Sequence, residues 1–199
     1  MGSRLFLWYS NKLKANPVLV NVVSGFAIAS AGDVAAQVFE QRYRTADDVQ
    51  SSPPTAAPAP APALDLDLRR TLNLGVIRCA VIAPFISVWY PFLARTFSST
   101  LQKVVFDQAF GSPFVISAVF LSNEILSGSA AAPSWDGFAS KFMSDGLSAW
   151  RLGLCYWPIV HSITFGLLPL RHQPLWAHCA SVPWNATLSF FANKRADAI

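Results

Sequence analysis

The sequence has little charge for its length. Only 13% of its 199 residues are Asp, Glu, Lys or Arg, while 53% are hydrophobic. Soluble domains carry about 25% charged residues, so this composition argues against an ordinary soluble domain. The net charge of +4 comes from basic residues that are scattered at the flanks of apolar stretches. Charges in such positions are typical of membrane topology signals, and we expect no nucleic-acid partner.

Residues that hold metals or form disulfides are also scarce. The three cysteines and three histidines are Cys79, Cys155, Cys179, His161, His172 and His178. Their wide separation fits neither a disulfide framework nor the close spacing of metal ligands. The sequence contains no nucleophile with a nearby base and no glycine-rich phosphate loop. We therefore expect no catalytic residue, no cofactor and no metal, and we interpret the chain as a protein that is not an enzyme.

Long apolar stretches are what the chain has instead. A transmembrane helix needs about 20 mostly apolar residues. The stretches expected to span the bilayer are 17–39, 72–93, 113–132 and 150–170. Residues 97–110 predict a short amphipathic helix, and residues 175–191 predict a packed or interfacial C-terminal helix. The sequence thus predicts one membrane domain over residues 1–199, an all-α integral membrane helical bundle of about four transmembrane helices plus short amphipathic helices.

Residues 45–67 contain an alternating run of proline and alanine. Such a run cannot form a helix, because proline lacks the backbone N–H and its ring clashes with the preceding turn. The segment also has almost no apolar side chain to bury. We expect an extended, proline-rich linker that lies outside the bilayer, between the first two spans.

The first span carries an acid, Asp33, well inside it. A carboxylate in a transmembrane helix costs roughly 2.5–3.5 kcal/mol on insertion scales, so it is seldom accidental. At 100° per residue, one face beside Asp33 consists of small residues, namely Gly25, Ala29, Gly32 and Ala36. Small residues let helices approach closely in lipid. We therefore predict that this face packs against neighbouring helices.

Other polar residues in or beside the apolar helices are Gln37, Arg78, Asp107, Gln108 and Arg151. Asp33 lies toward the end of its span and Arg78 toward the start of the next, so both approach the same face of the bilayer. An ion pair between Asp33 and Arg78 is therefore expected, since pairing lowers the cost of insertion. Two interpretations remain open. These groups line a water-filled path for small solutes or ions, or they lock the helices in register.

Three prolines fall in or beside the predicted spans, namely Pro84, Pro113 and Pro158. A proline inside a helix removes one backbone hydrogen bond and kinks or breaks the helix. We expect the amphipathic helix to end near Gly111 and a new helix to begin at Pro113. Kinks at these three positions could let a gate move.

Short strings along nearly the whole chain occur in an order that identifies a family. The strings are Trp8-Tyr9, Leu13, Asn16-Pro17, Gly25, Gly32-Asp33, Ala36-Gln37, Arg70, Arg78, Pro84, Trp89-Tyr90, Lys103, Asp107-Gln108, Pro113, Trp157-Pro158, Phe165, Pro169, Arg171, Trp184-Asn185 and Leu188-Ser189. In this order they resemble the Mpv-seventeen family, also named for the 22-kilodalton peroxisomal membrane protein. The chain departs from the pattern in its Pro-Ala insert, and in having His161 and Thr164 where the family more often has glutamine and asparagine. These departures are those of a divergent paralogue.

The resemblance implies a small protein of four spans in an organellar membrane. Members are associated with channel activity for small metabolites, with redox and stress metabolism and with mitochondrial DNA maintenance. In some fungi a relative organises peroxisome-derived bodies. The basic, acid-free N-terminus favours the mitochondrial inner membrane, with the peroxisomal membrane as the alternative.

The leading interpretation is a pore or channel for small solutes or ions, linked to organelle homeostasis and stress. Asp33 and Arg78 would form its polar centre, and Asp107 and Gln108 would lie at a mouth. Four helices could enclose a narrow path alone or only as a homo-oligomer. The alternative is a non-conducting scaffold that organises an organelle or recruits a partner protein.

Overall fold

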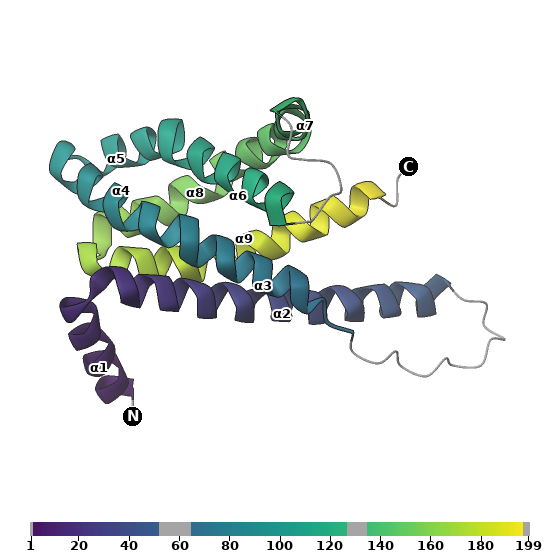
Figure 1. The fold of residues 1–199 in the computed structure, drawn as a ribbon, viewed down its shortest axis with the longest axis horizontal. Helices are drawn as coiled ribbons and strands as arrows, with labels where there is room; N and C mark the ends of the chain where they lie inside the picture. Colours follow the sequence, from purple (N-terminus) through teal and green to yellow (C-terminus); the bar gives the residue numbers. More distant parts are fainter. Residues whose placement is uncertain (1, 52–64, 127–134, 197–199) are drawn as a thin grey trace.

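The computed structural model describes residues 2–51, 65–126 and 135–196, and all regular elements in these ranges are helical. In chain order (Figure 1), the α-helices are α1 Gly2–Ala15, α2 Pro17–Ser51, α3 Leu68–Ile77, α4 Ala83–Thr96, α5 Thr100–Phe106, α6 Ser112–Leu126, α7 Trp135–Lys141, α8 Leu147–Leu167 and α9 Gln173–Ala196. The short turns between them are the π turns η1 Arg78–Ile82, η2 Asp107–Gly111 and η3 Phe142–Gly146, and the 3-10 turn η4 Leu170–His172. The predicted all-α class is confirmed.

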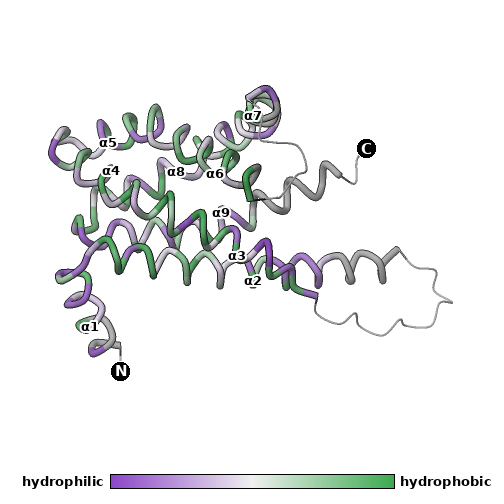
Figure 2. The backbone as a smooth tube through the Cα atoms, in the orientation of Figure 1, coloured by the Kyte–Doolittle hydropathy of each residue, from purple (hydrophilic) through white to green (hydrophobic). Residues whose placement is uncertain are grey.

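Helices long and apolar enough to cross a membrane occur three times in the described ranges, at Pro17–Tyr43, Leu68–Thr96 and Thr100–Ser122. The first two contain the predicted spans 17–39 and 72–93. Figure 2 shows hydrophobic residues along these helices and hydrophilic residues in α1, in α7 and where α3 begins beside α2. The predicted fourth span coincides with α8, which carries Arg151 and His161 and is not among the three.

The break predicted at Gly111 and Pro113 does not occur, because the helix continues from Thr100 to Leu126 through the π turn η2. The backbone N–H of Ser112 donates to the carbonyl of Asp107, five residues earlier, so the hydrogen-bonded ladder is widened rather than interrupted. Pro113 lies just beyond this wide turn, and the helix continues past it although proline lacks a backbone N–H. Residues 127–132 of the predicted third span lie outside the described residues.

The first span also continues further than the linker prediction allows. The sequence predicts that the linker starts at residue 45, but α2 extends to Ser51. Residues 45–51 contain no proline, and the first proline of the run is Pro53. Proline disfavours helix in the residue before it, which accounts for an end close to Ser51. Residues 52–64 of the predicted linker lie outside the described residues.

Helix α2 packs along α9 and against α3 and α4 (Figure 1), and α8 packs between α9 and α5. The glycines of α2 lie close to side chains of α9. A Cβ atom on Gly32 would lie 2.8 Å from Val182 Cγ2, and one on Gly25 would lie 2.9 Å from His178 Cε1. Ala29 and Ala36 are also buried. The structure therefore places small residues of α2 where α9 approaches.

The apolar core lies between the α3–α4 helix, α5, α8 and α9. Ile86, Tyr90 and Leu93 of α4 pack with Val104 of α5 and Phe165 of α8. Leu93 is fully buried. This core surrounds an internal cavity, which is one of two polar sites in the bundle.

Candidate functional site

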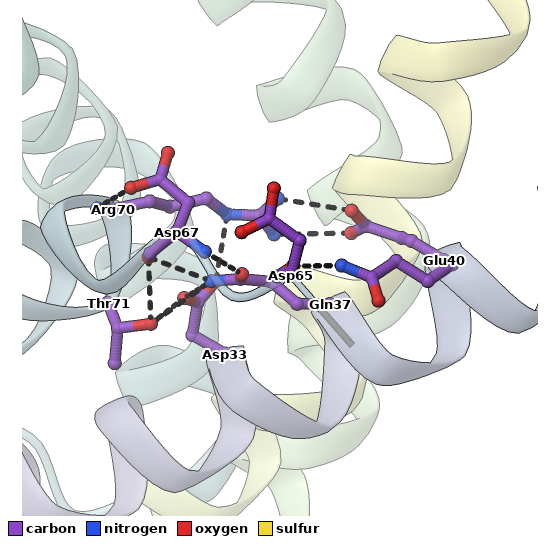
Figure 3. A network of polar contacts seen from close by, with 8 residues as sticks. Asp33, Gln37, Glu40, Asp65, Asp67, Arg70 and Thr71 are labelled. Carbon is purple, nitrogen blue, oxygen red and sulfur yellow. Dashed lines mark hydrogen bonds and ion pairs between the residues drawn. The ribbon is translucent and has the colours of Figure 1, made fainter. Parts of the chain in front are cut away.

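The first polar site is a network around Asp33, where α3 begins beside α2 (Figure 3). The Asp33 carboxylate accepts hydrogen bonds from Arg70 Nε at 2.9 Å, Thr71 Oγ1 at 2.7 Å and Gln37 Nε2 at 2.7 Å. Asp33 is only 3% exposed. Its buried charge is therefore both paired with a cation and hydrogen-bonded, which is what a carboxylate in this environment requires.

Arg70 connects two carboxylates in this network. Its Nη1 and Nη2 atoms donate to the Glu40 carboxylate at 3.1 and 3.2 Å, a two-point contact of the kind that arginine favours. Gln37 Oε1 accepts from the backbone N–H of Asp67 at 2.7 Å. The Asp67 side chain in turn caps α3 by accepting from the backbone N–H of Arg70 at 2.9 Å. The network thus fixes the start of α3 against α2.

The predicted pair between Asp33 and Arg78 is wrong, because Arg70 occupies that place. The two helices run antiparallel, and the start of α3 lies level with Gln37. Further along, Gly25 lies level with Arg78, since a Cβ atom on Gly25 would be 3.1 Å from Arg78 Cγ. Arg78 is therefore displaced from Asp33 along α2. Gln37, by contrast, lies with Asp33 as part of one network.

The second polar site is an internal cavity of about 130 Å³ between the α3–α4 helix, the η2–α6 segment, α8 and α9. Its wall carries the charged or titratable side chains Arg78, Tyr90, Asp107 and His161, and the polar side chains Ser112 and Asn185. Most of the remaining wall is apolar and aromatic. The cavity therefore brings Arg78 and Asp107, two predicted site residues on different spans, to one partly open space.

Both oxygens of the Asp107 carboxylate have partners. Oδ1 accepts from Trp89 Nε1 at 2.7 Å. Oδ2 lies 2.8 Å from His161 Nδ1 and accepts from Gln108 Nε2 at 3.2 Å. A Cβ atom on Gly111 would lie 2.6 Å from both Asp107 Oδ1 and Trp89 Nε1, so their close approach requires glycine there. The sequence places Asp107 and Gln108 at a mouth, whereas the structure buries both.

Arg78 and Asp107 have the same local geometry. Each is the first residue of a π turn, η1 for Arg78 and η2 for Asp107. At the same spacing after each charge comes a proline, Pro84 or Pro113, just beyond the turn. A π turn inside an α-helix is rare and occurs frequently at functional sites. The two wide turns lie on neighbouring helices and both border the cavity.

A family model and several relatives that match this chain carry the name Mpv17, PMP22 or Sym1. The Mpv17 / PMP22 family model matches residues 129–189. Protein sym1 of Aspergillus oryzae is 24% identical over 93% of this chain and 96% of its own length. Protein SYM1 of Candida glabrata is 27% identical over 94% of this chain and 89% of its own length. Mitochondrial inner membrane protein Mpv17 of Homo sapiens is 26% identical over 94% of this chain and 98% of its own length.

The chain is similar to the Mpv17 / PMP22 family, through the family model in residues 129–189 and through these relatives along most of its length. No solved structure matches it. This similarity supports an organellar membrane protein, and the mammalian relatives are named mitochondrial inner membrane proteins. The three apolar helices of the structure agree with a protein that contacts the lipid bilayer.

One predicted site residue lies apart from both polar sites, and one residue outside the predicted set lies in the second site. Arg151 is exposed on α8, outside both polar sites. His161 is buried against Asp107 in the second polar site. The available signal was its position after Trp157-Pro158, where the family more often has glutamine. Pro158 lies inside α8, and its role as a kink stays a prediction.

Proposed function

We propose that this protein is a pore or channel for small solutes, with the internal cavity on its pathway. The observation that supports this most is the meeting of Arg78 and Asp107 at one cavity, from two different apolar spans. Charged side chains within membrane helices usually face the bundle interior or a water-filled path, and they mark solute pathways. A single chain or a homo-oligomer could enclose the rest of the route.

The position of the two charges within their helices supports the same conclusion. Arg78 lies well inside the stretch Leu68–Thr96, and Asp107 lies well inside Thr100–Ser122. The wall between them is mostly apolar and carries a small number of polar groups, as is common where small molecules bind or pass. The Asp33 network lies instead where α3 begins. The polar centre of the proposed pore is therefore the cavity with Arg78 and Asp107, and not Asp33.

Single-channel current across a planar bilayer tests the proposal with purified full-length protein. We expect discrete openings from the wild type. Arg78→Gln should raise the permeability ratio of cations to anions, because it removes a positive charge from the pathway. Asp107→Asn should lower that ratio. Arg151→Gln is the matched control, since Arg151 is exposed outside the cavity and its loss should leave the ratio unchanged.

Two results would contradict the pore. One is the absence of current from protein whose fold is verified by circular dichroism and by a monodisperse elution profile. The other is current whose selectivity is the same in Arg78→Gln, Asp107→Asn and the wild type, because the pathway would then lie elsewhere.

A non-conducting scaffold is the second candidate function, and the Asp33 network favours it. Every contact of the Asp33 carboxylate described above is a bond to a residue of α2 or of the start of α3. Such an arrangement suits a register lock in a rigid bundle. A folded protein that is silent in the bilayer and is captured by a specific partner would support the scaffold.

A further inference from the structure

Arg78 is a half-buried cation in an apolar span, and it has no anion of its own in the described part of the chain. Within the described part of the chain it makes no hydrogen bond or ion pair. Its aliphatic stem passes over Gly25, beside His178, which supplies no negative charge. Arg78 also lines the internal cavity. An isolated charge in a low-dielectric interior is costly unless something compensates for it.

The carboxylate in the same cavity does not compensate for Arg78. Asp107 bonds instead to Trp89 Nε1, Gln108 Nε2 and His161 Nδ1, and it makes no ion pair with Arg78 among the described residues. Arg78 therefore remains able to bind an anion that enters the cavity. A guanidinium group has a planar set of N–H donors that fits both oxygens of a carboxylate.

The size and wall of the cavity restrict that anion. Its volume of about 130 Å³ is close to that of an apolar protein cavity of about 150 Å³ that admits benzene. Phe85, Trp89, Trp157 and Trp184 contribute aromatic rings to the wall. A strongly hydrated anion such as phosphate would lose more water there than the few polar groups of the wall can replace. A second negative charge would also be repelled by Asp107.

We propose that the cavity binds a small monocarboxylate, with its carboxylate on Arg78 and its apolar body among the aromatic rings. The body is about the size of a benzene ring. This inference deepens the proposed function, since it rests on the cavity lying on the solute pathway and names the solute class. Equilibrium binding needs no current, however, and so the binding site and the pore can fail separately.

Benzoate and benzamide form a matched pair of probes. They have nearly the same shape and size, but only benzoate is charged at pH 7. Trp89, Trp157 and Trp184 line the cavity, so their fluorescence reports occupancy directly. The full-length protein in nanodiscs of phosphatidylcholine is titrated with each compound, and isothermal titration calorimetry is run in parallel.

We expect saturable binding of benzoate and binding of benzamide at least tenfold weaker. Arg78→Gln should weaken benzoate binding at least tenfold and leave benzamide binding nearly unchanged. Arg78→Lys should retain part of the benzoate affinity, because it keeps the charge but not the planar donors. Arg151→Gln should bind benzoate like the wild type, since Arg151 is exposed outside the cavity.

A measurement on the wild type alone keeps the proposal falsifiable if Arg78→Gln does not fold. Benzoate should raise the thermal unfolding midpoint in a concentration-dependent way, and benzamide at the same concentration should raise it less. Equal effects of the two probes, unchanged benzoate affinity in folded Arg78→Gln, or inorganic phosphate binding as tightly as benzoate would each overturn the proposal. Saturable benzoate binding by a protein that carries no current would support the binding site and contradict the pore.

Discussion

His161 Nδ1 lies 2.8 Å from Asp107 Oδ2, which joins α8 to the π turn between α5 and α6. Trp89 and Gln108 donate to the same carboxylate from two other directions. The aromatic rings of Trp157 and Phe165 lie on either side of His161 along α8, with ring centroids 5.3 Å away in each case. The contact therefore fixes one wall of the internal cavity and determines how the buried charge of Asp107 is stabilised.

Substitution of His161 separates hydrogen bonding from packing. A glutamine at this position, the residue that the family more often has, can still donate an amide N–H to Asp107. We expect His161→Gln to cost less than about 1 kcal/mol, and His161→Leu, which leaves a buried oxygen with one donor fewer, to cost about 1–3 kcal/mol. Unfolding midpoints of the purified proteins in one detergent provide the comparison. Equal destabilisation by both substitutions would show that the hydrogen bond is unimportant.

The Asp33 network predicts a difference between its buried and its outer carboxylate. Asp33→Ala removes the acceptor of three hydrogen bonds and should destabilise the protein by about 3 kcal/mol, as for other buried partners of charged groups. Glu40→Gln weakens the outer, more exposed contact of Arg70, and should cost less than about 1 kcal/mol. Chemical denaturation in mixed micelles measures both. A small effect of Asp33→Ala would exclude the register lock.

The sequence predicts the two helices that meet at Asp33, but it does not predict which arginine pairs with Asp33. Hydropathy places the second span near residue 72, whereas the helix starts at Leu68 with Asp67 as its cap. Asp67 is a recognisable capping residue, and this signal would have brought Arg70 inside the helix. The position of α3 along α2 depends on packing, however. A shift of α3 by about two turns along α2 would place Arg78 beside Asp33 instead of Arg70.

The sequence does not predict the cavity either, for a different reason. Apolar periodicity assumes a regular helix, and two π turns at Arg78 and Asp107 change the face on which the following residues lie. The sequence indicates a break at Pro113, where the structure has a continuous helix. What the sequence does indicate reliably is the small-residue face of α2, because lipid-embedded helices need small side chains wherever their backbones approach.

For the small-residue face of α2, the sign of the stability change on replacing glycine by alanine shows whether the packing is tight. Alanine is favoured over glycine in an exposed helix by about 1 kcal/mol, but overpacking costs about 1–3 kcal/mol. A Cβ atom on Gly32 would lie 2.8 Å from Val182 Cγ2, so we expect Gly32→Ala to destabilise the protein by about 1 kcal/mol in total. Thermal unfolding of the purified variants measures this loss.

The double variant Gly32→Ala with Val182→Ala should recover part of that loss, because the second substitution removes the crowded methyl groups. Gly166→Ala is the control, since its Cβ atom would have only ordinary contacts with Thr100, the nearest at 3.5 Å. Destabilisation by Gly166→Ala equal to that by Gly32→Ala would contradict close packing of α2 on α9 as the cause.

The turn between α8 and α9, outside the apolar spans, gives a prediction about protonation. Partial burial, and then the neighbouring positive charge of Arg171, lower the pKa of His172 from its ordinary value of 6.5. Arg171 Nε also donates to His172 Nε2 at 3.0 Å, which requires that nitrogen to be unprotonated. The folded protein therefore binds a proton here less readily than the unfolded chain. His172 favours folding at neutral pH, and its contribution is lost as the pH falls below 6.5 toward the lowered pKa.

Arg171→Gln should raise the pKa of His172 toward its ordinary value without restoring it fully, because the burial remains. Nuclear magnetic resonance of histidine-labelled protein in micelles follows the titration of each imidazole, and a His172→Gln sample assigns the signal. Arg151→Gln, near the opposite end of α8, should leave the His172 midpoint unchanged. The variant should also lose less stability than the wild type between pH 7 and pH 5, because its folded and unfolded pKa values differ less. A His172 midpoint that does not move in Arg171→Gln would mean that the arginine does not act on this ring.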